Sequence, residues 1–234
     1  AATAVSNGSS GRAVFGLVQT STTGYTNVMH YITIASPSNS TDFGDMHANN
    51  RSSGNSGANN GTSDRGVFGG GYCAGTCGGG GMVDDMSYIT ISSAGNAAGH
   101  GNLTLNVQGA MGASNSTNDR GIQGGGAVDA STWAGTDTIG YYTISGTSGA
   151  SDFGNLRETN RPGAAASNGT SERGVIFITS GRVDYITISS TGNAADWGNV
   201  SASGTASAAT SNGSGDRCVY IGGSIIEYMT VSST

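Results

Sequence analysis

The hexapeptide Arg-Gly-Val-Phe-Gly-Gly at residues 65–70 decides the fold, because variants of it return along the whole chain. Related strings begin at Arg12, Arg120, Arg173 and Arg217. Their spacing of roughly 45 to 55 residues is typical of an architecture in which each repeat is one supersecondary unit. We therefore interpret the chain as five consecutive repeats.

Each repeat contains further strings of its own. A Tyr-Ile-Thr-Ile string or a variant of it occupies residues 31–34, 88–91, 141–144, 185–188 and 228–231. Strings of the Asp-Phe-Gly-Asn-Leu type occupy residues 42–46, 100–103, 152–156 and 196–200. Runs of small residues with Asn-Gly or Asn-Ser near their ends occupy residues 1–8, 55–61, 110–118, 163–169 and 205–213. The repeats span roughly residues 1–54, 55–109, 110–162, 163–204 and 205–234.

These four short segments predict one antiparallel four-stranded sheet per repeat, because β-branched and aromatic residues alternate with Gly, Asn, Ser and Asp turn signals. Sheets repeated around an axis make a β-propeller, so residues 1–234 are expected to form one all-β, five-bladed domain. The small-residue strands are expected to lie innermost, where bulky side chains would collide. No fourth string follows Val231, so the last blade is expected to lack its outer strand, and its open edge favours self-association.

Composition removes several functional classes. The nine basic residues are all Arg, the formal net charge is −6 and the pI is about 4.7. This balance argues against a nucleic-acid surface, and the lack of Lys excludes P-loop, kinase and Schiff-base chemistry. No apolar run is long enough for membrane insertion. No nucleophile, metal or general-base constellation stands out either, so we expect neither an enzyme, such as a glycosidase with paired carboxylates, nor a cofactor.

An acidic residue stands directly before the repeated Arg in four repeats, at Asp64, Asp119, Glu172 and Asp216. Recurrence at one blade position indicates structural ion pairs rather than a catalytic array. His100 departs from the pattern, because Gly99-His100 stands where Asp-Phe is expected in the second repeat. We expect a distorted outer strand there.

The order of the strings resembles a kelch blade, in which the second strand also ends in a Gly pair. Over essentially the whole chain the repeats more closely resemble those of virion structural and tail-fibre-like proteins of marine and cyanobacterial phages. This resemblance implies a virion or extracellular location, other virion proteins as partners, and a role in a tail fibre or surface appendage. Capsid decoration and a secreted, lectin-like bacterial propeller are the alternatives.

The connections on one side of the predicted propeller vary, whereas those on the other side barely change. The variable segments after the second strand are residues 16–28, 71–86, 126–139, 178–183 and 222–226. Because variable loops on a rigid scaffold commonly carry binding, we expect a ligand surface here. The resemblance to phage virion proteins implies that the ligand is a host-surface glycan or protein. Aromatic and Arg side chains provide most interface hot spots, so the candidate ligand residues are Tyr25, Tyr72, Trp133, Arg157, Arg161 and Arg182. The alternative is that these are ordinary loop residues.

Two of the three cysteines, Cys73 and Cys77, lie in the glycine-rich loop of the second repeat. Three cysteines do not make a zinc framework. A Cys73–Cys77 disulfide would staple this long loop and fits an oxidising setting, and free thiols fit the sequence equally well.

Overall fold

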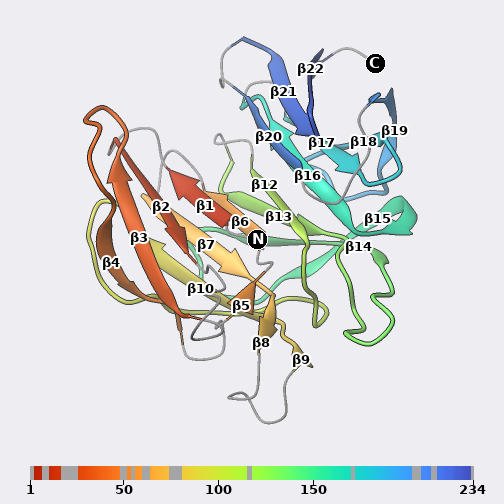
Figure 1. Ribbon diagram of the computed structural model, residues 1–234. Coiled ribbons are helices and arrows are strands. Elements are labelled where there is room, and N and C mark those ends of the chain that lie inside the picture. Colours follow the sequence, from red (N-terminus) through yellow and green to blue (C-terminus); the bar gives the residue numbers. More distant parts are fainter. Residues whose placement is uncertain are drawn as a thin grey trace.

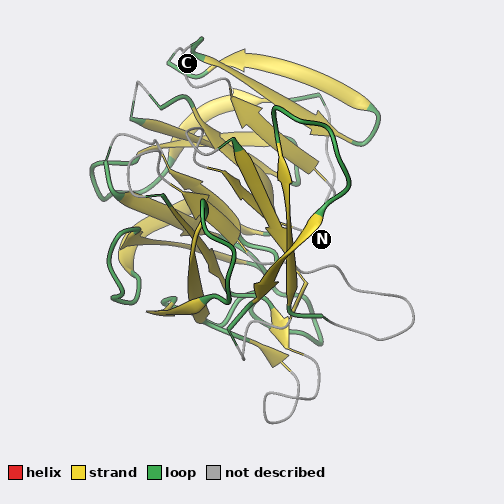
Figure 2. Ribbon diagram, turned by 90° about the vertical axis from the view of Figure 1, so that its left-hand side faces the viewer, coloured by secondary structure: helices red, strands yellow, loops and turns green. Residues whose placement is uncertain are grey.

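The computed structural model is an all-β structure of five small antiparallel sheets arranged in a ring, which is a five-bladed β-propeller (Figure 1). It describes residues 3–6, 11–16, 26–47, 52–53, 56–59, 64–73, 81–114, 118–169, 172–201, 207–211 and 215–232. Strands and loops make up this described part, which contains no helix (Figure 2). The expected fold class is confirmed.

Four blades have four strands each, and the fifth has three. Blade 1 contains β1 (Thr3–Ser6), β2 (Arg12–Gly16), β3 (Val28–Thr33) and β4 (Thr41–Asp45). Blade 2 contains β6 (Ser56–Asn59), β7 (Arg65–Gly69), β10 (Asp85–Thr90) and β11 (Ala98–Asn102). Blade 3 contains β12 (Met111–Ser114), β13 (Arg120–Gly124), β14 (Thr136–Thr143) and β15 (Ser151–Asn160). Blade 4 contains β16 (Pro162–Ser167), β17 (Arg173–Ile178), β18 (Arg182–Thr187) and β19 (Ala195–Asn199), and blade 5 contains β20 (Ser207–Ser211), β21 (Arg217–Gly222) and β22 (Ile225–Thr230).

The blades share one register even where the sequence departs from the pattern. In each four-stranded blade the third and fourth strands shift register at one equivalent point, such as Met29/His30 in blade 1 and Met86/Ser87 in blade 2. The expected distortion around His100 is therefore wrong, because β11 pairs with β10 as its counterparts do. Blade 2 instead carries an addition that the repeat pattern did not predict. This is a small sheet of β5 (Ser52–Ser53), β8 (Tyr72–Cys73) and β9 (Gly81–Met82).

The small-residue strands β1, β6, β12, β16 and β20 lie innermost, as expected, and successive ones pack against each other. Their approach is close enough that a Cβ atom on Gly112 of β12 would clash with the carbonyl oxygen of Gly57 of β6. The five strands surround a polar central cavity of about 370 Å³. Small side chains are therefore a requirement of the axis.

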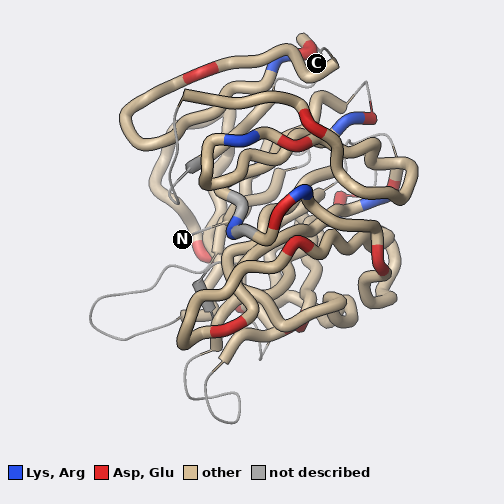
Figure 3. The backbone as a smooth tube through the Cα atoms, turned by 90° about the vertical axis from the view of Figure 1, so that its right-hand side faces the viewer, with Lys and Arg blue, Asp and Glu red and all other residues tan. Residues whose placement is uncertain are grey.

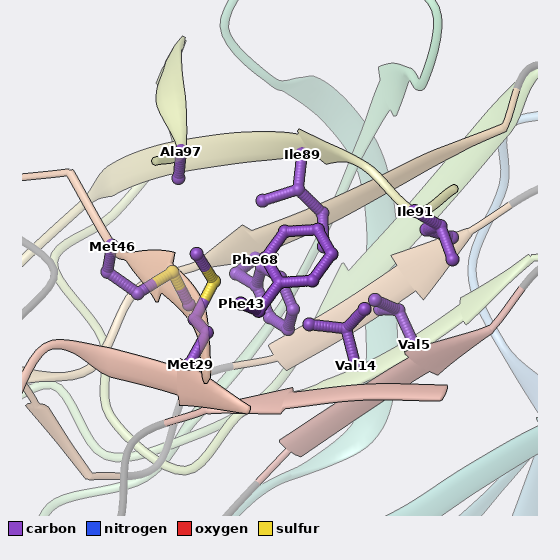
Figure 4. Close-up of a cluster of buried hydrophobic side chains, with 9 residues drawn as sticks. All are labelled: Val5, Val14, Met29, Phe43, Met46, Phe68, Ile89, Ile91 and Ala97. Carbon is purple, nitrogen blue, oxygen red and sulfur yellow. The ribbon is translucent and has the colours of Figure 1, made fainter. Parts of the chain in front are cut away.

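The apolar core is divided into layers between neighbouring blades. Figure 4 shows the layer between blades 1 and 2, where Val14, Met29 and Phe43 of blade 1 meet Phe68 and Ile89 of blade 2. Blades 2, 3 and 4 thus bury both faces of their sheets against their neighbours, whereas blades 1 and 5 each take part in one such layer. Chain stability depends on the contacts from blade to blade, as in other repeat proteins.

Candidate functional site

The repeated Arg of each blade has a structural function that explains its recurrence. The guanidinium of Arg65 lies 3.8 Å from the centre of the Tyr88 ring in its own blade. Its Nη1 also donates hydrogen bonds to backbone carbonyls of blade 3, at 2.8 Å to Ser145 and 2.6 Å to Gly146. Arg12, Arg120 and Arg173 make the same two kinds of contact. Each of these Arg residues therefore joins its blade to the following one.

The acidic residue before this Arg has partners of a different kind. Asp64 adopts a left-handed backbone conformation, with φ of 52°. Its carboxylate accepts hydrogen bonds from the backbone nitrogen and the hydroxyl of Ser92, directly after the third strand of the same blade. Asp119 and Asp216 accept equivalent hydrogen bonds from Ser145 and Ser232. The expected structural role is confirmed, but it is a turn-closing hydrogen bond rather than an ion pair with the adjacent Arg.

The Asp-Phe-Gly strands complete the links at the outer rim. In blade 1 the Phe43 carbonyl accepts a hydrogen bond from Gly95 nitrogen, and Asp45 nitrogen donates to the Asn96 side chain, both in the turn of blade 2. Gly44 between them has φ of 135°, and a Cβ there would lie 2.5 Å from the Gly95 oxygen. The recurring residues are thus used in joining blades or in closing turns within them, which leaves the non-recurring residues as candidates for function.

Trp133 is the most exposed aromatic residue among the predicted ligand positions in the described chain, with 47% of its surface accessible. It lies in the segment between β13 and β14, at φ of 57°, which is uncommon for a bulky residue. The segment is fixed at its base, because Ala127 exchanges two backbone hydrogen bonds with Gln108 of blade 2. A second pair of bonds, Val128 nitrogen to Ala134 oxygen and Thr136 nitrogen to Gly126 oxygen, closes it.

A compact turn holds Trp133 in this position. The Asp129 carboxylate accepts hydrogen bonds from Ser131 nitrogen at 2.7 Å, Ser131 Oγ at 2.6 Å and Thr132 nitrogen at 3.1 Å. These bonds, with the Ser131 hydroxyl contributing most, lower the pKa of Asp129 to about 2. Trp133 nitrogen donates to the Asp129 carbonyl at 2.8 Å. An exposed aromatic ring on such a turn loses little conformational entropy when a ligand binds it.

Of the three predicted Arg ligand positions, Arg161 contacts Trp133, and Arg157 and Arg182 have carboxylate partners. The Arg161 guanidinium lies 5.6 Å from the centre of the Trp133 ring. Arg157 Nη1 contacts Asp196 at 2.6 Å and the buried Asp184 at 3.4 Å. Arg182 pairs with Glu158 at 2.8 Å. Because Arg157 and Arg182 have carboxylate partners, these positions are mixed in charge rather than strongly basic. Acidic and basic positions are also interspersed along the described backbone as a whole (Figure 3).

The other predicted ligand and cysteine positions are separate from this group. Tyr72 is in β8 of the small sheet of blade 2, opposite Met82. Cys73 beside it is buried and disulfide-bonded, while its predicted partner Cys77 lies outside the described residues. Tyr25 also lies outside them. Trp133 and Arg161 are both among the residues predicted from sequence, but their cation–π contact and the Asp129 turn have no counterpart in the repeat pattern.

Two further titratable side chains, Cys218 and His100, are buried and are not presented to a ligand at the surface. Burial raises the pKa of the Cys218 thiol to about 12, which leaves it protonated inside the layer between blades 4 and 5. His100 is fully buried between the rings of Tyr88 and Tyr142, and burial lowers its pKa. No group of three or more His, Cys, Asp or Glu that could hold a metal occurs among the described residues. This described part also contains no helix long and apolar enough to span a membrane.

Comparison with solved structures shows that the chain has the fold of β-propellers. It is similar to the structure of YjhT, with a TM-score of 0.69 and 10% identity, covering 94% of this chain and 71% of that one. It is also similar to a chain in the crystal structure of a nidogen/laminin complex, with a TM-score of 0.59 and 9% identity, covering 95% and 73% of the two chains. The sequence matches no protein-family model and no curated protein. At these identities the likeness concerns the fold alone.

Proposed function

We propose that this propeller is a binding module of a phage virion appendage, such as a tail fibre, and that it recognises a host-surface glycan or protein. The observation that carries the binding role is the pre-ordered, exposed Trp133 with Arg161 against its ring. Aromatic and Arg side chains of this kind provide most of the binding energy at interfaces. The assignment to a virion is supported by the resemblance of the repeats to phage virion proteins.

The distribution of recurring residues supports binding on one side only. The repeated Arg residues connect the blades and the Asp residues before them close turns within their own blades, whereas Trp133 and Arg161 lie in segments that differ from repeat to repeat. A lectin-like propeller with one equivalent pocket per blade would need equivalent segments, and blades 1 to 5 do not share them. We therefore infer a single ligand surface around the loops of blades 3 and 4.

Binding is tested by screening the purified chain against host-surface polysaccharides and glycan arrays, and then comparing Trp133→Ala and Arg161→Ala with the parent. Each substitution is expected to weaken binding about tenfold or more, which corresponds to a loss of about 1.4 kcal/mol or more in binding free energy. Leu105→Ala is the matched control, because Leu105 is also an exposed apolar loop residue, with 39% of its surface accessible. Equal binding by parent and both variants would remove Trp133 and Arg161 from the ligand surface.

The location is tested by labelling purified virus particles from the source sample with an antibody against this chain and imaging them by electron microscopy. Label on the tail or its fibres supports the proposal as stated. Label on the capsid shell would make the chain a decoration protein. Particles without label would indicate a secreted cellular propeller, and would leave the Trp133 binding experiment as a separate result.

A further inference from the structure

Blade 5 exposes the sheet face that every other blade buries. In blade 4, Phe177 and Val183 point toward blade 5 and have no accessible surface. By strand register, Ile221 and Ile226 occupy the same positions in blade 5, yet 44% and 70% of their surfaces are accessible. Tyr228, which matches the repeated Tyr of the other blades, is 65% exposed. We call this surface of Ile221, Ile226 and Tyr228 with Arg217 and Val219 the open face of blade 5.

Blade 1 exposes the complementary feature on its opposite face. The residue that follows the third strand is Ile91, Ile144, Ile188 and Val231 in blades 2 to 5, and each has no accessible surface. Each of them packs against the preceding blade. Ile34 is the equivalent residue of blade 1, and 56% of its surface is accessible.

The open face also contains the site that receives this residue in the other interfaces. Between blades 2 and 3, Ile144 packs against Ala58 and Val67, which lie beside Arg65. On blade 5 a hollow of about 200 Å³ lies at the matching positions, beside Arg217 and Val219. Arg217 keeps its contact with the Tyr228 ring at 4.3 Å, but within the described part of the chain it has no carbonyl of a following blade to bind.

The two exposed surfaces do not cover each other. Inner strands of successive blades pack together from β1 through β6, β12 and β16 to β20, whereas no comparable packing joins β20 to β1 in the part of the chain that the structure describes. Figure 1 shows blades 1 and 5 as the two ends of the series. Terminal repeats of repeat proteins normally present a polar outer face, and this one is apolar. We call the space between blades 5 and 1 the seam.

We propose that the seam is a docking site for one further four-stranded sheet of this same repeat. The residue of that sheet equivalent to Ile144 enters the hollow of blade 5, and the carbonyl of that residue accepts a hydrogen bond from Arg217. On its other face, the Arg of the docked sheet donates to the carbonyl of Ile34, as Arg65 does to Ile144. The docked sheet thereby repeats on both sides the interface that already occurs four times in the chain.

A single sheet fits this site better than a second copy of the whole chain. All four interfaces within the chain have the same construction, so they turn each blade by a similar amount around the axis. A second copy that placed its blade 1 on the open face would bring four more blades behind it, toward blade 1 of the first copy. A single sheet with the two faces of this repeat covers both the open face of blade 5 and the exposed face of blade 1.

The experiment adds such a sheet to the full chain. The extension, fused after Thr234, is a second copy of residues 192–204, which completes the outer strand of blade 5, followed by a second copy of residues 163–204, which is one whole repeat. The expected result is a monomer with a Tm raised by about 5 °C or more in a single transition. An unchanged Tm, or a second transition for the added segment, would overturn the proposal.

Ile226→Asp is then made in the parent and in the extended chain. It is expected to leave the Tm of the parent nearly unchanged, because the side chain is exposed, and to lower that of the extended chain by about 5 °C or more. Leu105→Asp, at an exposed site away from the seam, is the matched control and should be neutral in both. If Ile226→Asp destabilises the parent, the seam is already covered and the proposal fails. Sedimentation of the parent then tells whether a second copy or ring closure covers it.

Discussion

Arg65 and Arg217 provide an internal comparison of what the link between blades contributes to stability. Both guanidinium groups lie against a Tyr ring of their own blade, at 3.8 Å and 4.3 Å from the ring centre. Arg65 also donates to the carbonyls of Ser145 and Gly146 in the next blade, while Arg217 has no such described partner. Replacing each by Ala therefore removes the ring contact in both variants and the link between blades in only one.

The expected costs follow from these contacts. Hydrogen bonds that involve a charged group contribute about 1.5–3 kcal/mol. A cation–π contact at an exposed site contributes about 0.5–1 kcal/mol. Arg65→Ala should thus lower the free energy of unfolding by about 2–4 kcal/mol, and Arg217→Ala by about 0.5–1 kcal/mol. For a chain of this length, at about 2–4 °C per kcal/mol, the first change lowers the Tm by about 4–16 °C and the second by about 1–4 °C.

Urea and thermal unfolding followed by circular dichroism measure both variants against the parent. The reasoning requires the cost at Arg65 to exceed that at Arg217 by at least twofold. Equal costs would show that the hydrogen bonds to the following blade contribute nothing measurable, and that the repeated Arg is retained for its contact with Tyr alone.

Three further predictions concern buried groups and the axis. Because burial lowers the pKa of His100, the unfolded chain binds a proton below its ordinary pKa of 6.5 and the folded chain does not. The free energy of unfolding is therefore highest above pH 6.5 and decreases as the pH falls below it. Urea unfolding of His100→Phe should show a smaller decrease than the parent between about pH 7 and pH 5. Burial raises the pKa of Asp184, so the contribution of Asp184 to the free energy of unfolding is greatest below pH 3.8 and is lost as the pH rises. Asp184→Asn should remove this pH dependence in the same urea-unfolding assay. Gly112→Ala should cost about 1–3 kcal/mol by thermal unfolding, because its Cβ would clash with Gly57, whereas Gly95→Ala, with open space around it, should not.

The repeat strings predicted the strands closely because each string contains both a strand and the signal that ends it. The string at residues 65–70 corresponds to β7 at Arg65–Gly69, and the last repeat, which has no fourth string, forms a blade of three strands. The strings could not identify the partners of their own polar residues. Asp64 and Arg65 are adjacent in sequence, yet Asp64 bonds Ser92 and Arg65 reaches Ser145 in another blade. Partners so far apart depend on how the blades turn around the axis, which no single repeat encodes.

The candidate site was harder to predict for a related reason. Trp133 is recognisable from sequence as an aromatic residue in a variable segment, but its backbone conformation depends on three hydrogen bonds to Asp129 and on the Gln108 bridge from blade 2. Among the residues that the structure describes, none of these contacts recurs in another repeat. A local prediction therefore identifies the residue but not the turn that orders it, and ordering is what reduces the entropy cost of binding.

The recurring residues of this chain join the blades or close turns within them, and the proposed site uses residues that do not recur. A chain with 42 glycines and no Lys has few large side chains for its core. Hydrogen bonds such as those from Arg65 to Gly146 and from Asp45 to Asn96 occur at equivalent positions in successive interfaces between blades. A substitution that affects one such position loses a link that the neighbouring layers do not replace, since each blade contacts only its neighbours. Segments outside these links, including the one that contains Trp133, can change without that cost, so the binding surface proposed above can vary there while the propeller stays the same.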